Sequence, residues 1–243
     1  MLGIGMAYGM FNPTKVWSSD RAIFFDGVND KCAITFEDAD ITNTIPNLGT
    51  ISLWVKFEEA SSDMTILDFK HGARQYMEIW WDSSESKICF TRTDTNGSNP
   101  VTVTSNLIED IIELGKIHIV CSWNLGTAST GLGLSINGDS TGVGDCHEWQ
   151  TTSDVNITYG VRSSKFFNGW IHDVLFSSVA ISAGNIFNSG YPKNESYSNS
   201  SAIILYHTAS EKDFEDETHQ YPTLTNPDGL TVTFDGAITT PQP

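Results

Sequence analysis

Apolar residues alternate with polar ones in short runs along most of the chain, which is the pattern of strands with one buried face. In residues 51–57, Ile51, Leu53 and Val55 fall on one face, and Lys56 falls on the other. The same period of two predicts further strands over residues 76–81, 88–90, 117–123, 132–136, 155–161, 170–176, 203–206 and 230–234. Helical periodicity is scarce and predicts two turns over 106–114 and one short turn over 182–187.

Many short strands separated by turn signals predict an all-β fold, an antiparallel two-sheet jelly-roll sandwich. The pair Asn137-Gly138 directly follows one apolar run and predicts a type I′ hairpin. We expect one sandwich over residues 20–190, preceded by an N-terminal extension, residues 1–19, that forms a docking arm. Residues 191–243 are too few for an independent β domain, so we expect them to return strands to the same sandwich.

Charge narrows the classes of partner. The 243 residues carry 30 Asp and Glu against 13 Lys and Arg, a net charge of −17. Such a surface repels phosphate backbones, so a nucleic-acid partner is excluded. No apolar run is long enough for a membrane span.

The four cysteines, Cys32, Cys89, Cys121 and Cys146, match no zinc or redox spacing. Residues 1–10 are apolar, lack a cationic start and are interrupted by glycines, so we interpret them as mature protein and not as a secretion signal. We therefore expect four reduced thiols.

Three stretches resemble the laminin-G-like, concanavalin-A-like jelly-roll superfamily. They are IFFDGVNDKCAI at 23–34, GTISLWVK at 49–56, and residues 167–186, which begin FNGWIHDV. Cys32, His172, Asp173 and Asn185 depart from the usual residues of these blocks. The resemblance covers about residues 20–190 and implies the sandwich. The superfamily hosts lectins, glycosidases, adhesion modules and virion proteins, so the fold assigns no activity by itself.

The apolar start, ahead of such a jelly roll, resembles accessory structural proteins of marine tailed phages. This resemblance implies a non-enzymatic virion component, as capsid decoration, cement, tail or fibre. Its location would be the virion, assembled in the host cytoplasm, and its partners would be other virion proteins and further copies of this chain. The alternative is a lectin-like module for host-surface glycans, and a glycoside hydrolase ranks last.

No catalytic residues are predicted. Glu211, Asp213 and Glu215 form an E-x-D-x-E pattern, which resembles the motif of retaining glucanases in this superfamily. The intervening residues include Lys212, where the motif has an apolar residue, and the segment follows the third family block. We expect a solvated acidic loop there.

Two further kinds of site are candidates. Laminin-G-like domains often carry Ca²⁺ at a loop rim, which makes Asp26, Asn29 and Asp30 candidate calcium ligands, with Asp139 and Asp145 as further donors. Turn formation is the alternative role for these residues.

The candidate aromatic contacts for a glycan or a protein are Trp80, Trp81, Trp149 and Tyr191. Trp80 and Trp81 are adjacent, so in a strand they face opposite sides and only one of them can be exposed.

Overall fold

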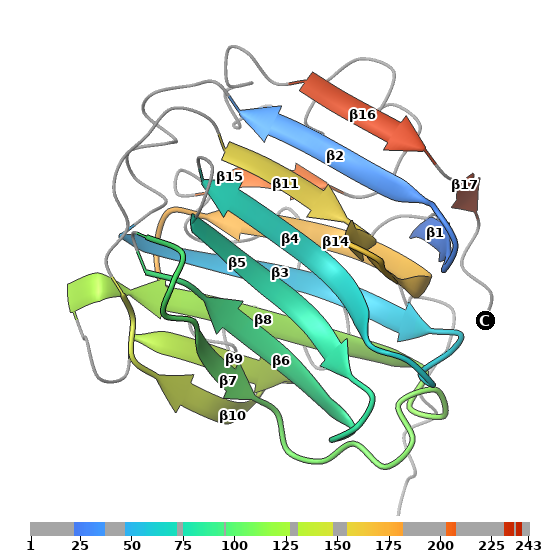
Figure 1. Cartoon of the computed structure of the whole chain (residues 1–243), viewed down its shortest axis with the longest axis horizontal. Helices are drawn as coiled ribbons and strands as arrows, with labels where there is room; N and C mark the ends of the chain where they lie inside the picture. Colours follow the sequence, from blue (N-terminus) through green and yellow to red (C-terminus); the bar gives the residue numbers. More distant parts are fainter. Residues whose placement is uncertain are drawn as a thin grey trace, which may run out of the picture.

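The computed structural model describes residues 22–36, 47–71, 75–94, 96–126, 131–147, 155–181, 203–207, 231–235 and 237–239. Within these ranges the chain forms strands and turns and contains no α-helix. Two antiparallel sheets stack face to face (Figure 1). The predicted all-β jelly-roll-like sandwich is confirmed.

The sheet in front in Figure 1 has seven strands. Their order is β16 (Thr231–Asp235), β2 (Lys31–Phe36), β11 (Val155–Tyr159), β4 (Met64–His71), β5 (Gln75–Asp82), β6 (Lys87–Arg92) and β7 (Val101–Thr104). A short hairpin, β12 (Val161–Arg162) and β13 (Lys165–Phe166), packs against β4. This hairpin supplies two of the charged side chains of the candidate site.

The second sheet has eight strands. Their order is β10 (Asp139–Gly144), β9 (Leu132–Ile136), β8 (Lys116–Asn124), β3 (Leu48–Phe57), β14 (Asn168–Ser177), β1 (Ala22–Asp26) and β17 (Ala237–Thr239), and β15 (Ile203–His207) also pairs with β14. The three C-terminal strands, β15 to β17, therefore lie in the same two sheets as the rest of the chain.

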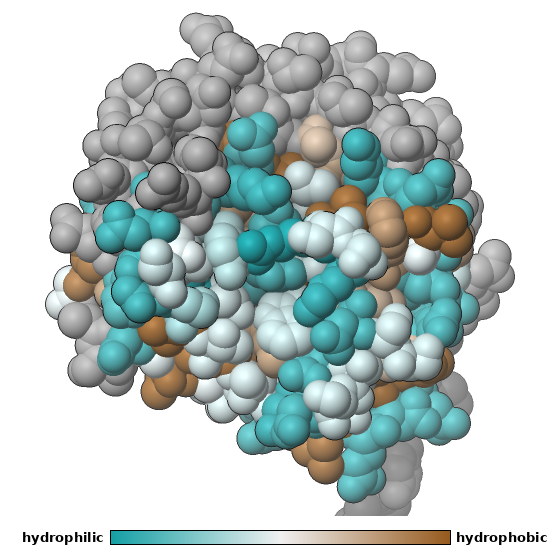
Figure 2. All heavy atoms as spheres, viewed as in Figure 1, coloured by the Kyte–Doolittle hydropathy of each residue, from teal (hydrophilic) through white to brown (hydrophobic). Residues whose placement is uncertain are grey.

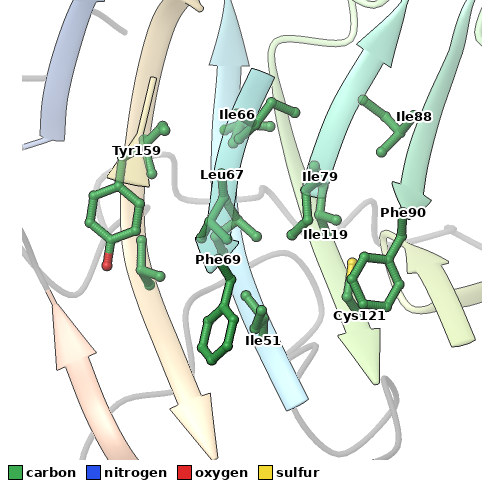
Figure 3. Packing of buried hydrophobic residues seen from close by; sticks show 14 of the residues in the cluster. Ile51, Ile66, Leu67, Phe69, Ile79, Ile88, Phe90, Ile119, Cys121 and Tyr159 are labelled. Carbon is green, nitrogen blue, oxygen red and sulfur yellow. The ribbon is translucent and has the colours of Figure 1, made fainter. Parts of the chain in front are cut away.

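The core lies between the two sheets, where alternate residues of facing strands meet (Figure 3). Ile51 and Ile119 project from the eight-stranded sheet toward Ile79 and Phe90 of the seven-stranded sheet. Cys121 lies in the same layer, fully buried. All four cysteines are buried, and their thiols are free.

Arg92 is a polar exception at a core position of β6. Its side chain is fully buried, and burial lowers the pKa of the guanidinium to about 10. Nε and Nη2 donate hydrogen bonds to the carbonyl of His147 at 3.2 and 3.0 Å. The buried charge therefore ties the segment after β10 to the seven-stranded sheet.

The turns test two predictions. Asn137 and Gly138 both have positive φ, 51° and 88°, so the type I′ hairpin is confirmed. The helix predicted over 106–114 is wrong, because residues 109–114 form only turns. Ile111 is buried, but Leu107 and Leu114 are exposed, so the segment has no continuous apolar stripe to pack. The short turn predicted over 182–187 lies outside the described residues.

No helix of the described part of the chain is long and apolar enough to span a membrane.

Candidate functional site

A line of polar residues crosses the centre of the outer face of the seven-stranded sheet. Thr158, Asp68, Glu78 and Thr91 stand directly opposite one another on β11, β4, β5 and β6. Directly opposed side chains on one face lie about 5 Å apart, so these groups interact. The outer surface over β4, β5 and β6 is hydrophilic to neutral, and the more hydrophobic residues lie toward its edges (Figure 2). This face is the candidate functional site.

Two carboxylates meet in this line and are held by cations. Arg162, from the hairpin, contacts Glu78 through Nη1, and its Nε lies 3.6 Å from Oδ1 of Asp68. Lys70 Nζ lies 3.2 Å from Oδ2 of Asp68. Thr65 donates a hydrogen bond of 2.6 Å to Oε1 of Glu78. Like charges directly opposite each other destabilise a sheet. The contacts with Arg162, Lys70 and Thr65 offset this repulsion between Asp68 and Glu78.

Burial and the neighbouring charges shift the pKa values of Asp68 and Arg162 in this cluster. It raises the pKa of the Asp68 carboxyl, and Glu78 adds to the increase, while Lys70 and Arg162 act in the opposite direction. For Arg162, burial acts to lower the pKa, but Glu78, Tyr76 and Asp68 together raise it above its usual value. The guanidinium is therefore a fixed positive charge between the two carboxyl groups.

Two aromatic rings flank Glu78 on the same face of β5. The guanidinium carbon of Arg162 lies 3.4 Å from the centre of the Tyr76 ring, and Nζ of Lys165 lies 4.4 Å from the centre of the Trp80 ring. Trp80 Nε1 donates a hydrogen bond of 3.0 Å to Thr91. Strand geometry separates the two rings by about 13 Å along β5. The face thus combines apolar ring surface, hydrogen-bond donors and carboxylate acceptors.

The predicted aromatic residues fall into two groups. Trp80 faces outward, as part of this site, while Trp81 is only 2% exposed and donates from Nε1 to the carbonyl of Ala60 at 2.9 Å. The two neighbours do face opposite sides of the strand, and Trp81 is a core residue. Trp149 and Tyr191 lie outside the described residues.

Sequence reasoning missed most of the site. Tyr76 and Glu78 alternate with Trp80 on a strand that was predicted, so their shared face could have been found from the period of two. Asp68 lies on β4, which the alternation did not predict, and Arg162 comes from a hairpin remote in sequence. Only the fold brings β4, β5 and the hairpin together.

Of the predicted calcium ligands, Asp26 ends β1, and Asn29 and Asp30 lie in the turn that follows it. Asp26 Oδ1 accepts hydrogen bonds from the backbone N–H groups of Val28 and Asn29 at 2.8 and 3.4 Å, and Asp30 Oδ2 accepts one from the N–H of Asp26 at 2.9 Å. These bonds give the carboxylates a role in the turn.

Within the described ranges, no group of three or more His, Cys, Asp or Glu side chains is arranged to hold a metal. Calcium binding stays a prediction. The acidic triplet Glu211, Asp213 and Glu215 lies outside the described residues.

A second polar cluster lies on the outer face of the eight-stranded sheet, and its members are buried. Ser52 Oγ and His118 Nε2 are 2.7 Å apart, and the His118 ring stacks on Trp54 with centroids 4.8 Å apart. His172 Nδ1 lies 2.8 Å from Asp173, whose φ is +46°. Burial lowers the pKa of His118 to about 4, against an opposing effect of Asp173. Because Ser52 and His118 are 2% and 1% exposed, this cluster presents no open surface to a ligand.

The fold agrees with the comparison by sequence. A laminin G family model, described as the concanavalin A-like lectin/glucanases superfamily, matches residues 25–187. The chain belongs to this superfamily. No curated protein matches it in sequence.

Solved structures of the same fold include binding proteins and binding domains. The heptameric SAP-like pentraxin of Limulus polyphemus is 10% identical with a TM-score of 0.57, covering 90% of this chain and 94% of the pentraxin. The sialidase CBM40 of Ruminococcus gnavus bound to α2,3-sialyllactose is 11% identical with a TM-score of 0.51, covering 68% and 94%. Domains LG4-5 of the mouse laminin α1 chain are 15% identical with a TM-score of 0.50, covering 66% and 44%. At these identities the likeness concerns the fold alone.

Proposed function

We propose that this chain is a carbohydrate-binding module that recognises a neutral glycan on the outer face of its seven-stranded sheet. The observation that carries the proposal is the grouping of Tyr76, Glu78 and Trp80 on one face of β5 beside Asp68 and Arg162. Membership of a superfamily of lectins and glucanases supports the same class of ligand. The CBM40 of the Ruminococcus gnavus sialidase is a carbohydrate-binding relative in fold.

Sugar recognition needs what this face provides. Sugar rings present apolar C–H faces and a rim of hydroxyl groups, and flat aromatic side chains pair with the first while carboxylates and amines pair with the second. Tyr76 and Trp80 supply two rings about 13 Å apart, which suits an oligosaccharide better than a single sugar. The partly exposed Thr158 and Arg162 and the exposed Lys70 lie on the same face and supply hydrogen-bonding groups for hydroxyl groups, while the buried Asp68 and Glu78 hold these cations in place.

Charge favours a neutral glycan at this site. The cations over the face are already engaged by carboxylates, Arg162 by Glu78 and Lys165 by Asp63 at 3.2 Å. The chain as a whole has a net charge of −17, which repels a polyanionic ligand. An uncharged oligosaccharide needs no free cation on this face and is not repelled by the net negative charge.

We infer binding without hydrolysis. A glycosidase needs one protonated carboxylic acid at the leaving oxygen and one carboxylate free to attack or to activate water. Both oxygens of Glu78 are engaged, by Thr65 and by Arg162, and the Asp68 side chain is only 2% exposed. Incubating the protein with the bound oligosaccharide should release no new reducing ends, and steady release would contradict this inference.

A glycan array followed by calorimetric titration of the best neutral ligand tests the binding site. Trp80→Ala and Tyr76→Ala should each weaken binding about tenfold or more, since each removes one ring. Phe24→Ala is the matched control, because it removes a partly exposed ring from the opposite sheet and should leave affinity unchanged. Absence of binding to any neutral glycan, or equal losses in all three variants, would contradict the proposal.

The role as a structural component of a phage particle, with glycan attachment as one of its tasks, also stays a proposal. It rests on the resemblance of the apolar start to accessory proteins of marine tailed phages and on the lack of a predicted catalytic set, and the start lies outside the described residues. Mass spectrometry of purified particles tests it, and absence of the chain from the particle would contradict it. Deleting residues 1–9 should leave a folded protein that no longer incorporates.

Self-association would raise the avidity of weak glycan contacts. We propose a homo-oligomer for this reason, in keeping with the heptameric state of the fold-related pentraxin. Light scattering after size exclusion should give a multiple of the 26.7 kDa chain mass, and the monomer mass would contradict it.

A further inference from the structure

Asparagine is followed directly by glycine at three places in the chain, at Asn96, Asn137 and Asn168. Such a pair is able to modify itself, because the backbone nitrogen of the glycine attacks the side-chain amide carbon of the asparagine and expels ammonia. Glycine favours this reaction, since no Cβ hinders the approach and the backbone adopts unusual φ and ψ values freely. The backbone must bend for the attack, so the rate depends on how firmly the fold holds each pair.

The pair Asn137-Gly138 is held in the type I′ hairpin between β9 and β10. Oδ1 of Asn137 accepts a hydrogen bond of 2.8 Å from the N–H of His118, and the N–H of Asn137 donates one of 2.8 Å to the carbonyl of His118. These bonds fix both the side chain and the backbone of Asn137 against β8. To react, this side chain must first leave its bond to β8.

The pair Asn168-Gly169 is held even more firmly, at the start of β14. The carbonyl of Asn168 accepts a hydrogen bond of 3.1 Å from the N–H of Glu58, and its Nδ2 donates one of 3.4 Å to Glu59. Gly169 is buried, opposite Phe25 and Phe57 on the two neighbouring strands. The backbone therefore has no room to bend at this pair.

The pair Asn96-Gly97 lies in the loop between β6 and β7, and Asn96 is exposed. The N–H groups of Asn96 and Ser98 donate to Oδ1 of Asp94 at 3.0 and 2.9 Å, and the N–H of Gly97 donates to the carbonyl of Asp94 at 3.1 Å. None of these bonds engages the side-chain amide of Asn96. All of them are local to one exposed turn, so they open without disturbing either sheet.

We propose that Asn96 is a self-modification site, which deamidates in the folded protein while Asn137 and Asn168 stay intact. The backbone nitrogen of Gly97 forms a bond to Cγ of Asn96, the bond from Cγ to Nδ2 breaks, and the proton lost by Gly97 leaves with ammonia. Water then opens the cyclic imide at either carbonyl and gives aspartate or isoaspartate. The reaction consumes water, releases ammonia and needs no oxidant or cofactor.

The product changes the charge and the backbone beside one end of β5. Either product adds a carboxylate next to Asp94, and isoaspartate also lengthens the main chain within the turn. The loop begins at Thr93, whose N–H donates to the carbonyl of Tyr76 at 3.1 Å and whose Oγ1 accepts from the N–H of Tyr76 at 3.0 Å. The modification therefore lies near the Tyr76 end of the seven-stranded sheet, although it does not depend on the function proposed for that face.

Peptide mass spectrometry of the full chain, incubated at mildly alkaline pH, tests the proposal. It measures the conversion of each asparagine and separates aspartate from isoaspartate. In the folded chain, Asn96 should react at least about tenfold faster than Asn137 or Asn168, because only the latter two require opening of the fold. The rate at Asn96 should rise with pH, since the attacking amide must lose its proton. In denaturant, all three should react at similar rates.

Two variants separate this chemistry from a general effect on the loop. Gly97→Ala places a Cβ beside the attacking nitrogen and should slow the reaction at Asn96 at least about tenfold, with the other two sites unchanged. Ser98→Ala alters the same turn without touching a reacting group and should leave the rate at Asn96 unchanged. Equal rates at the three sites of the folded chain, or no reaction at Asn96 until denaturant is added, would overturn the proposal. No glycan enters this experiment, so its outcome is independent of the proposed glycan site.

Discussion

The guanidinium of Arg162 stacks on the ring of Tyr76 while it also contacts the carboxylate of Glu78. One side chain thus joins the hairpin to the aromatic and acidic parts of the seven-stranded sheet. Without it, Asp68 and Glu78 would face each other with Lys70 as the remaining cation. The positions of the acidic and aromatic side chains in the proposed glycan site therefore depend on Arg162.

Arg162→Ala should lower the free energy of unfolding by about 2 kcal/mol at neutral pH, less than for a fully buried pair because the site is partly exposed. In the variant, the pKa of Asp68 rises further above its unfolded value, so the folded state binds the proton more tightly. The loss should therefore shrink as the pH falls and Asp68 becomes protonated. Urea denaturation at two pH values measures this difference, and Lys165→Ala, at a more exposed position, should cost less than about 1 kcal/mol at both.

His118 should make the fold sensitive to mild acid. Its folded pKa of about 4 is below the ordinary value, so the unfolded chain takes up the proton first as the pH falls below about 6.5. This group alone should lower the free energy of unfolding by about 2 kcal/mol between pH 7 and pH 5. His118→Gln should remove that part of the acid response, and an unchanged pH dependence in the variant would show that His118 is not buried in its neutral form.

Alanine substitutions at two glycines with positive φ distinguish the cost of backbone strain from the cost of steric overlap. Gly115 has φ +67° and nothing within 4 Å of an added Cβ, whereas at Gly160, with φ +84°, an added Cβ would lie 2.2 Å from the Phe25 ring. Gly115→Ala should cost about 1 kcal/mol from the backbone alone. Gly160→Ala should cost about 3 kcal/mol or more, because the core ring must move. Equal costs in denaturant titrations would contradict this packing.

The thiols should be inert in the folded chain. Burial raises the pKa of Cys89 to about 12, and it raises the pKa values of Cys32 and Cys121 as well. A thiol reagent at neutral pH should label none of the four cysteines quickly in the native state and all four in denaturant. Fast labelling of the folded protein would place at least one thiol at the surface.

The sequence predicts much of the fold, because alternation reports directly on which face of a strand is buried. Ile51, Leu53 and Val55 form a core face as the pattern requires, and Asn137-Gly138 forms the expected hairpin. β4 has a different pattern. Its buried residues Ile66 and Leu67 are adjacent at a β-bulge, which breaks the period of two and hides the strand.

The site is less predictable than the fold for a physical reason. Trp80 could be found as one of two adjacent tryptophans, but its partners lie on other elements. Asp68 and Glu78 are opposed only through the register of β4 and β5, and Arg162 reaches them only because its hairpin packs on β4. Register and long-range packing are three-dimensional properties that no local pattern encodes.

Chemical-shift mapping with the best neutral oligosaccharide shows on which sheet the glycan binds. In ¹H–¹⁵N spectra of the labelled chain, we expect the perturbed signals to belong to the strands around Tyr76, Glu78 and Trp80, with the Trp80 indole N–H among the largest shifts. The shifts should saturate with the calorimetric affinity, and in Trp80→Ala they should saturate only at about tenfold higher ligand concentration or above. Perturbations confined to the eight-stranded sheet or to the turn around Asp26, with the Trp80 indole unmoved, would contradict it.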